Sequence, residues 1–139
     1  MILIETSVLV DAIRDTGGSI GRTIVEFAAD REIVISSFTE LELLVGARND
    51  GEWQVLESYV ATRRILQPNQ STWNAAARIH FDLRRQGQTV RSIVDCCIAQ
   101  MALENDILLL HDDRDFEAIA TVRPLKHERS SHKREQGAQ

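Results

Sequence analysis

The chain has 139 residues and a formal net charge of −5, with 43% hydrophobic and 27% charged residues. This length fits one domain with its own apolar core, and the composition is that of a globular protein rather than a disordered one. The negative charge argues against a simple nucleic-acid coat protein, which would be basic, but it does not exclude a nuclease whose acids bind cations. No apolar run approaches the roughly 20 residues that span a bilayer, so no membrane partner is expected.

The compartment is indicated by the N-terminal residues and by the cysteines. Residues 1–4 are apolar, but Glu5 follows at once, without the basic leader and long apolar stretch of a signal peptide. The only two cysteines, Cys96 and Cys97, are adjacent and therefore poorly placed to join distant segments by disulfides. Both features predict a cytoplasmic protein.

Short apolar segments alternate with amphipathic ones along the chain. Strands are expected at 2–4, 33–35, 64–66, 107–110 and 122–125. Helices are expected at 6–14, 19–30, 39–48, around 53–60, from 71 to near 87, from 91 or 92 to near 105, and at 115–120.

The expected strands lack polar alternation, which is typical of a sheet that is covered on both faces. The sequence therefore predicts an α/β fold, with three α/β/α layers around a mostly parallel central sheet. One domain is expected over residues 1–125, followed by a polar, mobile tail over residues 126–139.

Acidic residues follow two of the expected strands. In open α/β sheets the functional crevice lies beyond the carboxyl ends of the strands. Glu5 directly follows the first strand, and Asp112, Asp113 and Asp115 follow the strongly apolar strand at 107–110. Because parallel strands end at the same edge of a sheet, these carboxylates are able to converge on one point.

Two further acids lie in apolar surroundings. Asp95 occurs within Ser-Ile-Val-Asp-Cys-Cys-Ile-Ala, where burial costs energy unless a cation or hydrogen-bond donors compensate. Glu42 lies on a helical stripe of mixed character. Each acid alone has a simpler interpretation: Asp95 favours a helix N-terminus, and Asp113 caps the helix that follows it. Together, Glu5, Glu42, Asp95 and Asp113 favour a Mg²⁺ or Mn²⁺ site.

The histidines give no zinc signature. Their spacing does not match a ligand pattern. We interpret them as packing or surface residues, with the one beside the acids as a weaker candidate for a substrate contact; they are His80, His111, His127 and His132.

Four segments, in this order and with these gaps, resemble the PIN-domain ribonucleases that form the VapC toxins of VapBC toxin–antitoxin pairs. The resemblance covers about residues 1–125 and rests on the set of motifs rather than on any one of them. The segments are Ile2-Leu3-Ile4-Glu5-Thr6-Ser7, Glu42-Leu43-Leu44-Val45-Gly46, Arg91-Ser92-Ile93-Val94-Asp95-Cys96-Cys97-Ile98-Ala99 and Leu110-His111-Asp112-Asp113-Arg114-Asp115-Phe116.

The resemblance implies a metal-dependent endoribonuclease that hydrolyses RNA phosphodiester bonds through attack by a metal-activated water. It implies one or two Mg²⁺ or Mn²⁺ ions, neutralisation by a cognate VapB-type antitoxin, and a homodimer. The catalytic acids it implies are Glu5, Glu42, Asp95 and Asp113, and the metal ligands are Glu5, Asp95, Asp113 and the accessory Asp115.

The resemblance also implies substrate contacts. The hydroxyl of Thr6 or Ser7 is expected to hold a water or a phosphate, and Arg91 is expected to engage RNA phosphates. The alternative for Arg91 and its neighbours Arg84 and Arg85 is a solvated helix end or a contact with antitoxin acids.

One residue departs from the family pattern, because the first motif of the family carries Asp where this chain has Glu5. The extra methylene moves the carboxylate by about 1 Å, and such an error costs on the order of 100-fold in rate. Three explanations stay open: a natural variant with a relaxed site, an attenuating substitution, or a domain that binds antitoxin or RNA without cutting.

Other folds with acidic strand ends were weighed. The Asp-x-Asp after the strand at 107–110 also fits a HAD-type phosphatase, but that family has this motif early in the chain and a lysine downstream, whereas the only lysines here are Lys126 and Lys133. A receiver-type domain would likewise carry its acids early. A plain α/β scaffold would leave Asp95 unexplained.

Overall fold

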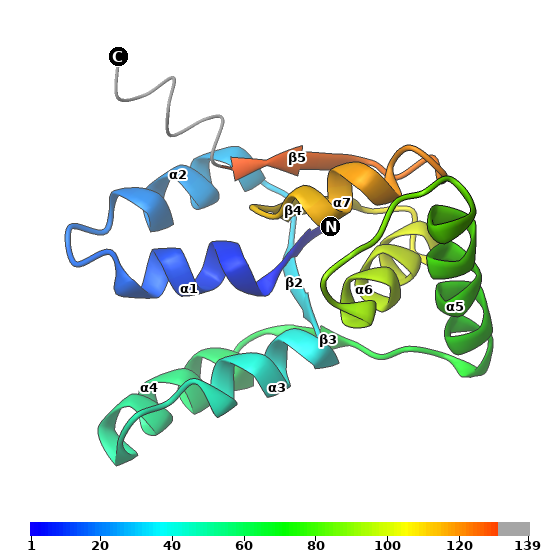
Figure 1. Ribbon diagram of the computed structural model, residues 1–139. Helices are drawn as coiled ribbons and strands as arrows, with labels where there is room; N and C mark the ends of the chain where they lie inside the picture. Colours follow the sequence, from blue (N-terminus) through cyan, green and yellow to red (C-terminus); the bar gives the residue numbers. More distant parts are fainter. Residues whose placement is uncertain (131–139) are drawn as a thin grey trace.

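The computed structural model describes residues 1–130 and contains one five-stranded sheet. The strand order is β3-β2-β1-β4-β5, and all neighbouring strands are parallel (Figure 1). The predicted α/β fold with a mostly parallel sheet is therefore confirmed. The strands are β1 (Ile2–Ile4), β2 (Ile33–Ser36), β3 (Arg64–Leu66), β4 (Leu108–His111) and β5 (His127–Arg129).

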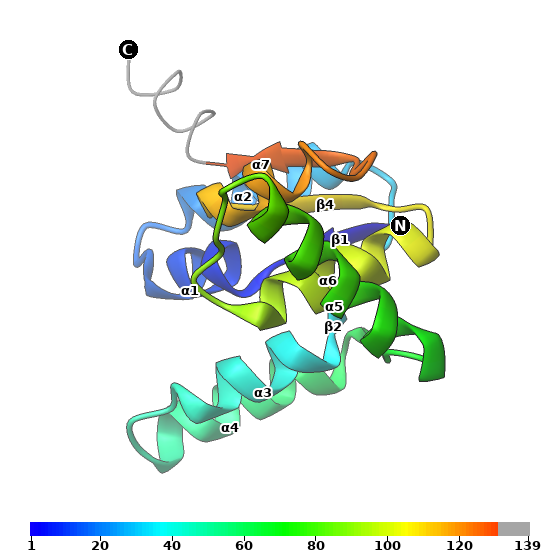
Figure 2. The ribbon, with the colours of Figure 1, turned by 45° about the vertical axis from the view of Figure 1, so that its right-hand side comes forward.

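Helices follow the strands and form the outer layers. Figures 1 and 2 show α5 and α6 on one side of the sheet and α1 and α2 on the other, while α3 and α4 run side by side. None of the helices within residues 1–130 is long and apolar enough to cross a membrane. The helices are α1 (Thr6–Arg14), α2 (Ser19–Ala28), α3 (Ser37–Val45), α4 (Asp50–Ala61), α5 (Gln70–Arg85), α6 (Ile93–Glu104) and α7 (Arg114–Ile119).

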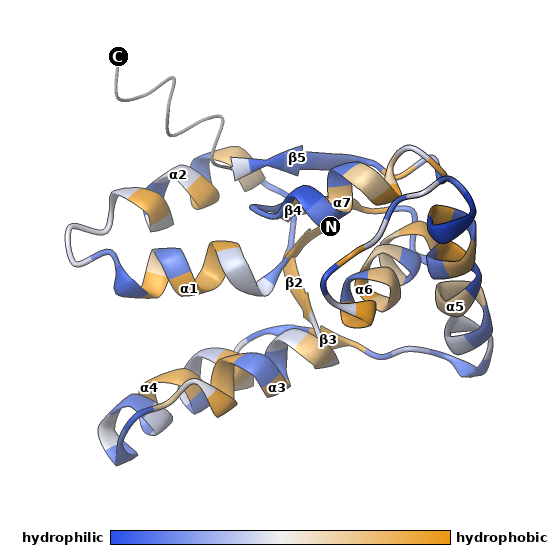
Figure 3. Ribbon diagram, viewed as in Figure 1, coloured by the Kyte–Doolittle hydropathy of each residue, from blue (hydrophilic) through white to orange (hydrophobic). Residues whose placement is uncertain are grey.

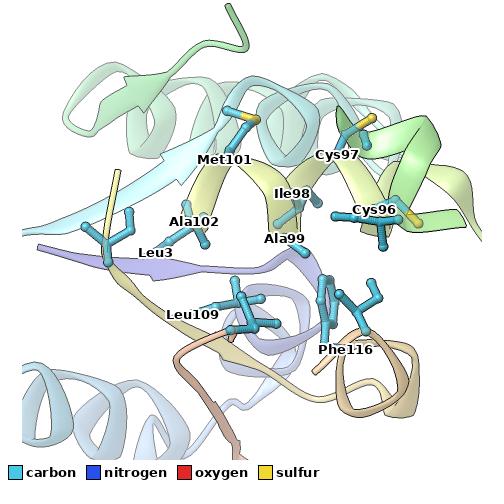
Figure 4. Close-up of a cluster of buried hydrophobic side chains, with 14 of the residues drawn as sticks. Leu3, Cys96, Cys97, Ile98, Ala99, Met101, Ala102, Leu109 and Phe116 are labelled. Atoms are coloured by element: carbon cyan, nitrogen blue, oxygen red, sulfur yellow. The ribbon is translucent and has the colours of Figure 1, made fainter. Parts of the chain in front are cut away.

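Each face of the sheet has its own apolar core. Leu3 and Leu109 pack with residues of α5, α6 and α7, among them Ile98 and Phe116 (Figure 4). On the opposite face, Ile2, Ile4, Ile35 and Leu110 pack with residues of α1 to α4. Because consecutive side chains point to opposite faces, a sheet that is covered on both sides needs strands that are apolar throughout, as β1 is.

The last strand was predicted in the wrong place. The prediction put it at 122–125, but β5 begins at His127 and pairs with β4. Leu125 is buried in the core instead of forming a strand. The sequence of β5 is polar (Figure 3), as suits a partly covered edge strand, so hydropathy does not reveal it. Residues 127–129, expected in the tail, thus belong to the sheet, and residues 131–139 lie outside the described part.

Candidate metal site at the carboxyl edge of the sheet

The parallel topology brings the acidic segments to one edge of the sheet. Glu5 follows the end of β1, and Asp113 comes two residues after the end of β4, the strand that pairs with β1. The backbone N–H of Glu5 donates to the carbonyl of Leu110 at 2.9 Å, which links the two strand ends directly. Asp95 reaches the same edge from the first turn of α6.

Three aspartates converge at this edge. Asp95, Asp113 and Asp115 each offer a carboxylate oxygen, and these oxygens lie within 4.8 Å of one another. Oxygens bound to one octahedral Mg²⁺ at about 2.1 Å lie about 3.0 to 4.2 Å apart, so modest side-chain adjustments would bring all three into one coordination sphere. This set of hard oxygen donors fits Mg²⁺ or Mn²⁺.

Local hydrogen bonds fix the orientation of the Asp113 and Asp115 carboxylates. Asp113 is the N-cap of α7, and its Oδ1 accepts the backbone N–H of Asp115 at 2.9 Å. Asp115 Oδ2 accepts the backbone N–H of Arg91 at 2.9 Å, and the Arg91 guanidinium donates to Asp113 Oδ1 at 3.1 Å. The capping role predicted for Asp113 and its place in the cluster therefore coexist.

The electrostatics of the cluster favour the protonated form of Asp95. Burial raises the pKa of Asp95 to about 8, and the hydrogen bond with Asp115 and the charges of Asp113 and Glu5 act in the same direction. Asp95 is only 7% exposed. At neutral pH its carboxyl therefore retains a proton, and the proton occupies a position that a bound cation would take over.

Glu5 lies beside this cluster but is oriented by α1. It is the N-cap of α1, and its Oε2 accepts the backbone N–H of Ser7 at 2.9 Å and the Ser7 hydroxyl. Burial raises the pKa of Glu5, the Ser7 hydrogen bonds oppose that shift, and the charges of Glu42 and Asp113 add to it. Glu5 is thus electrostatically coupled to the acids, although it is not among the three grouped aspartates.

Glu42 is held through threonine hydroxyls. The Thr6 hydroxyl lies 3.1 Å from Glu42 Oε1 and 3.0 Å from the hydroxyl of buried Thr39. Thr39 is in turn bonded through its backbone N–H to Ser36 Oγ, the cap of α3. Glu42 itself is exposed, on the rim of the site.

Ser7 joins the two strand-end loops. Its hydroxyl contacts Glu5 and accepts the backbone N–H of Asp112 at 3.2 Å. The hydroxyls of Thr6 and Ser7, predicted to contact substrate, therefore both serve internal hydrogen bonds that position acids.

His111 has a role that its sequence context did not predict. Its predicted roles were packing or, more weakly, a substrate contact, but His111 is fully buried and its Nδ1 accepts the backbone N–H of Asp113 at 3.2 Å. Burial and the neighbouring His127 lower the pKa of His111 to about 4, so the ring is neutral. Its place two residues before Asp113 was the only sequence signal.

Comparisons with known proteins give matches along most of this chain. The PIN-domain family model matches residues 2–122. Ribonuclease VapC11 of Mycobacterium tuberculosis is 37% identical over 131 residues, which cover 91% of this chain and 96% of the relative.

Two solved structures share the fold. DNA-bound VapBC from Salmonella typhimurium has a TM-score of 0.77 at 22% identity, over 92% of this chain and 96% of that one. VapBC2 from Rickettsia felis, bound to a promoter DNA fragment, has a TM-score of 0.76 at 21% identity, over 93% and 98%.

Replacing Asp95 by Asn is expected to stabilise the protein in EDTA at pH 8. An acid whose pKa is raised by folding makes the protein less stable as the pH rises from its ordinary pKa, near 4, towards its folded pKa, here about 8. Asn keeps the shape without the charge, so Asp95→Asn should raise the free energy of unfolding at pH 8 by at least about 1 kcal/mol, and by little near pH 4. Urea denaturation in EDTA at both pH values measures this, and a variant that is less stable at pH 8 contradicts it.

Proposed function

Because the chain belongs to the PIN-domain family, we propose that it is a metal-dependent endoribonuclease, the toxin of a toxin–antitoxin pair. The observation that carries the proposal is the convergence of Asp95, Asp113 and Asp115 at the carboxyl edge of the sheet. The raised pKa of Asp95 supports a cation at this point. The identity with a VapC ribonuclease along nearly the whole of both chains supports the reaction.

The three aspartates hold Mg²⁺ or Mn²⁺, and Glu5 adds negative charge beside them. When bound, the ion supplies a Lewis acid that polarises the scissile phosphate and makes a water nucleophilic near neutral pH. The protein keeps the ligands in place through Ser7, Arg91 and the cap of α7. Thr6 fixes the orientation of Glu42, which faces the site from α3.

Arg91 has two tasks in this proposal. Its backbone N–H orients Asp115, while its guanidinium contacts Asp113 and remains largely exposed at the rim. An exposed ion pair of this kind contributes little stability, so the Arg91 guanidinium would leave Asp113 at low cost. It would then be able to engage an RNA phosphate, which is the role predicted from the sequence.

The antitoxin partner is supported by a groove next to the site. Helices α1, α3 and α4 line a cavity of about 500 Å³, with apolar Val10, Leu43 and Val55 and the rim residues Glu42 and Arg48. We assign the VapB-type antitoxin to this groove, because a segment bound there reaches Glu42 at the catalytic edge. A homodimer stays a prediction. A cytoplasmic location agrees with the free cysteines Cys96 and Cys97.

Cleavage of a cellular RNA pool tests the function. The purified chain should give discrete cuts with Mg²⁺ or Mn²⁺ and none with EDTA, and Asp95→Asn should lower the rate by at least about 100-fold. Glu26→Gln is the matched control, since it neutralises an exposed acid on α2, away from the sheet edge, and should cut at the normal rate. Equal cutting by Asp95→Asn, or no cutting by the folded chain with either metal, overturns the proposal.

Glu5→Asp is expected to raise the cleavage rate, by about tenfold. The shorter side chain restores the acid of the family motif, and Asp is a better N-cap for α1 than Glu. Glu5→Gln is the matched comparison, because it keeps the length and removes the charge, and it should cut more slowly than the natural chain. Single-turnover rates on one RNA measure all three, and a Glu5→Gln rate equal to that of the natural chain removes Glu5 from the site.

Arg91→Gln is expected to change metal binding and cleavage in opposite directions. Removing the guanidinium takes away a cation that competes for Asp113, so Mn²⁺ affinity should rise by about threefold to tenfold. Cleavage at saturating Mn²⁺ should fall, because a phosphate contact is lost. Calorimetric titration and single-turnover rates check both; a parallel loss of affinity and rate would make Arg91 only structural.

A further inference from the structure

Two histidines on neighbouring strands form a partly buried contact beside the loop that carries Asp113. His111 of β4 and His127 of β5 are stacked, with ring centroids 5.2 Å apart and an interplanar angle of 25°. His111 Nε2 lies 3.0 Å from His127 Nδ1. Phe116 of α7 packs against His111 at a centroid distance of 4.9 Å, so the ring is held between the edge strand and the helix that Asp113 caps.

The hydrogen-bond partners of His111 determine which of its ring nitrogens carries the proton. The backbone N–H of Asp113 donates to Nδ1 of His111, so this nitrogen carries no proton. A neutral imidazole then has its proton on Nε2, and Nε2–H donates to Nδ1 of His127. The chain of donors therefore leads from Asp113 through His111 to β5.

This chain fixes the backbone of a residue whose carboxylate belongs to the metal site. The N–H of Asp113 precedes the first turn of α7, so it is outside the helical hydrogen-bond pattern. The buried acceptor on His111 satisfies it and sets the direction in which the Asp113 side chain leaves the backbone. Without this acceptor the loop between β4 and α7 loses one of the bonds that aim Asp113.

A second contact from β5 holds the same loop. Arg129 donates through Nε to Asp112 Oδ1 at 3.3 Å and through Nη1 to Glu117 Oε2 at 3.2 Å. His127 and Arg129 both lie beyond residues 2–122, the part matched by the PIN-domain model. Strand β5, which lies outside the matched region, thus contacts residues before and after Asp113 in the chain, namely Asp112 and Glu117.

We propose that β5 is a brace for the metal-binding loop, and that His111 is a positioning residue that couples this strand to Asp113. The proposal rests on the metal site of the proposed function. In this proposal His127 and Arg129, which lie past residue 122, contribute to the metal site. Substitutions in β5 should therefore alter metal affinity, although no residue of β5 contacts the ion.

The direct test compares His111→Asn with His111→Leu. Asn places an acceptor oxygen near the position of Nδ1 and keeps the bond from Asp113, whereas Leu fills the space without an acceptor. The His111→Leu variant should bind Mn²⁺ about tenfold more weakly than the natural chain, which is the lower end of the loss seen when a residue that orients a metal ligand is removed. The Mn²⁺ affinity of the His111→Asn variant should stay within about threefold of that of the natural chain. Calorimetric titration gives the affinities, and melting temperatures in EDTA report the loss of packing separately. Equal Mn²⁺ affinity of His111→Leu and the natural chain, with both folded, overturns the proposal.

The matched pair on β5 is His127→Asn and His127→Phe. Phe keeps the stacked ring and removes the acceptor for His111, so His127→Phe should weaken Mn²⁺ binding by severalfold while His127→Asn retains it. His80→Leu on α5, far along the chain from the loop, is the control and should leave the affinity unchanged. If both His127 variants bind Mn²⁺ as the natural chain does, β5 is not a brace.

Nuclear magnetic resonance of the natural chain gives a readout that needs neither metal nor a folded variant. Long-range proton–nitrogen spectra should show His111 neutral with its proton on Nε2, and the Asp113 amide should exchange slowly with solvent. A proton on His111 Nδ1 overturns the brace. Absence of Mn²⁺ binding by the natural chain with the expected His111 tautomer instead overturns the metal site of the proposed function, on which the positioning role depends.

Discussion

The close approach of Asp95, Asp113 and Asp115 is the least favourable interaction in the candidate site. Like charges brought together with partial burial repel one another, and the raised pKa of Asp95 is the direct sign of that cost. The fold imposes the proximity by placing the first turn of α6, with Asp95, beside the start of α7, with Asp113 and Asp115. Arg91 offsets part of the repulsion, and the proton retained on Asp95 offsets more. A cation bound at the aspartates, as proposed above, would remove much of this cost.

Two acids at the candidate metal site are also helix caps. Asp113 caps α7 and Glu5 caps α1, each through an oxygen that accepts a backbone N–H two residues on. The cap fixes the rotamer, and the fixed rotamer aims the carboxylate at the sheet edge. Local stability and function are therefore not alternatives at these positions, which explains why either acid alone is ambiguous in the sequence.

The sequence predicts the parts of the molecule that depend on local hydropathy. Strands β1 and β4 were predicted because they are apolar runs buried on both faces, and Asp95 because a carboxylate stands out inside such a run. The strand β5 was misplaced because an edge strand needs no apolar pattern. The pairing of His111 with His127 exists only through the register between β4 and β5, a long-range fact with no local signal.

Glu5 shows how one added methylene is accommodated. Its carboxylate turns towards the start of α1, where Ser7 holds Oε2 through both the backbone N–H and the hydroxyl. The same Ser7 hydroxyl accepts the N–H of Asp112, so the position of Glu5 is tied to the loop that carries Asp113. The charge of Glu5 still acts on Asp95 and Asp113. Since charge attracts a cation over a longer distance than direct coordination requires, Glu5 would keep its electrostatic contribution in the proposed site, in which the three aspartates carry the coordination.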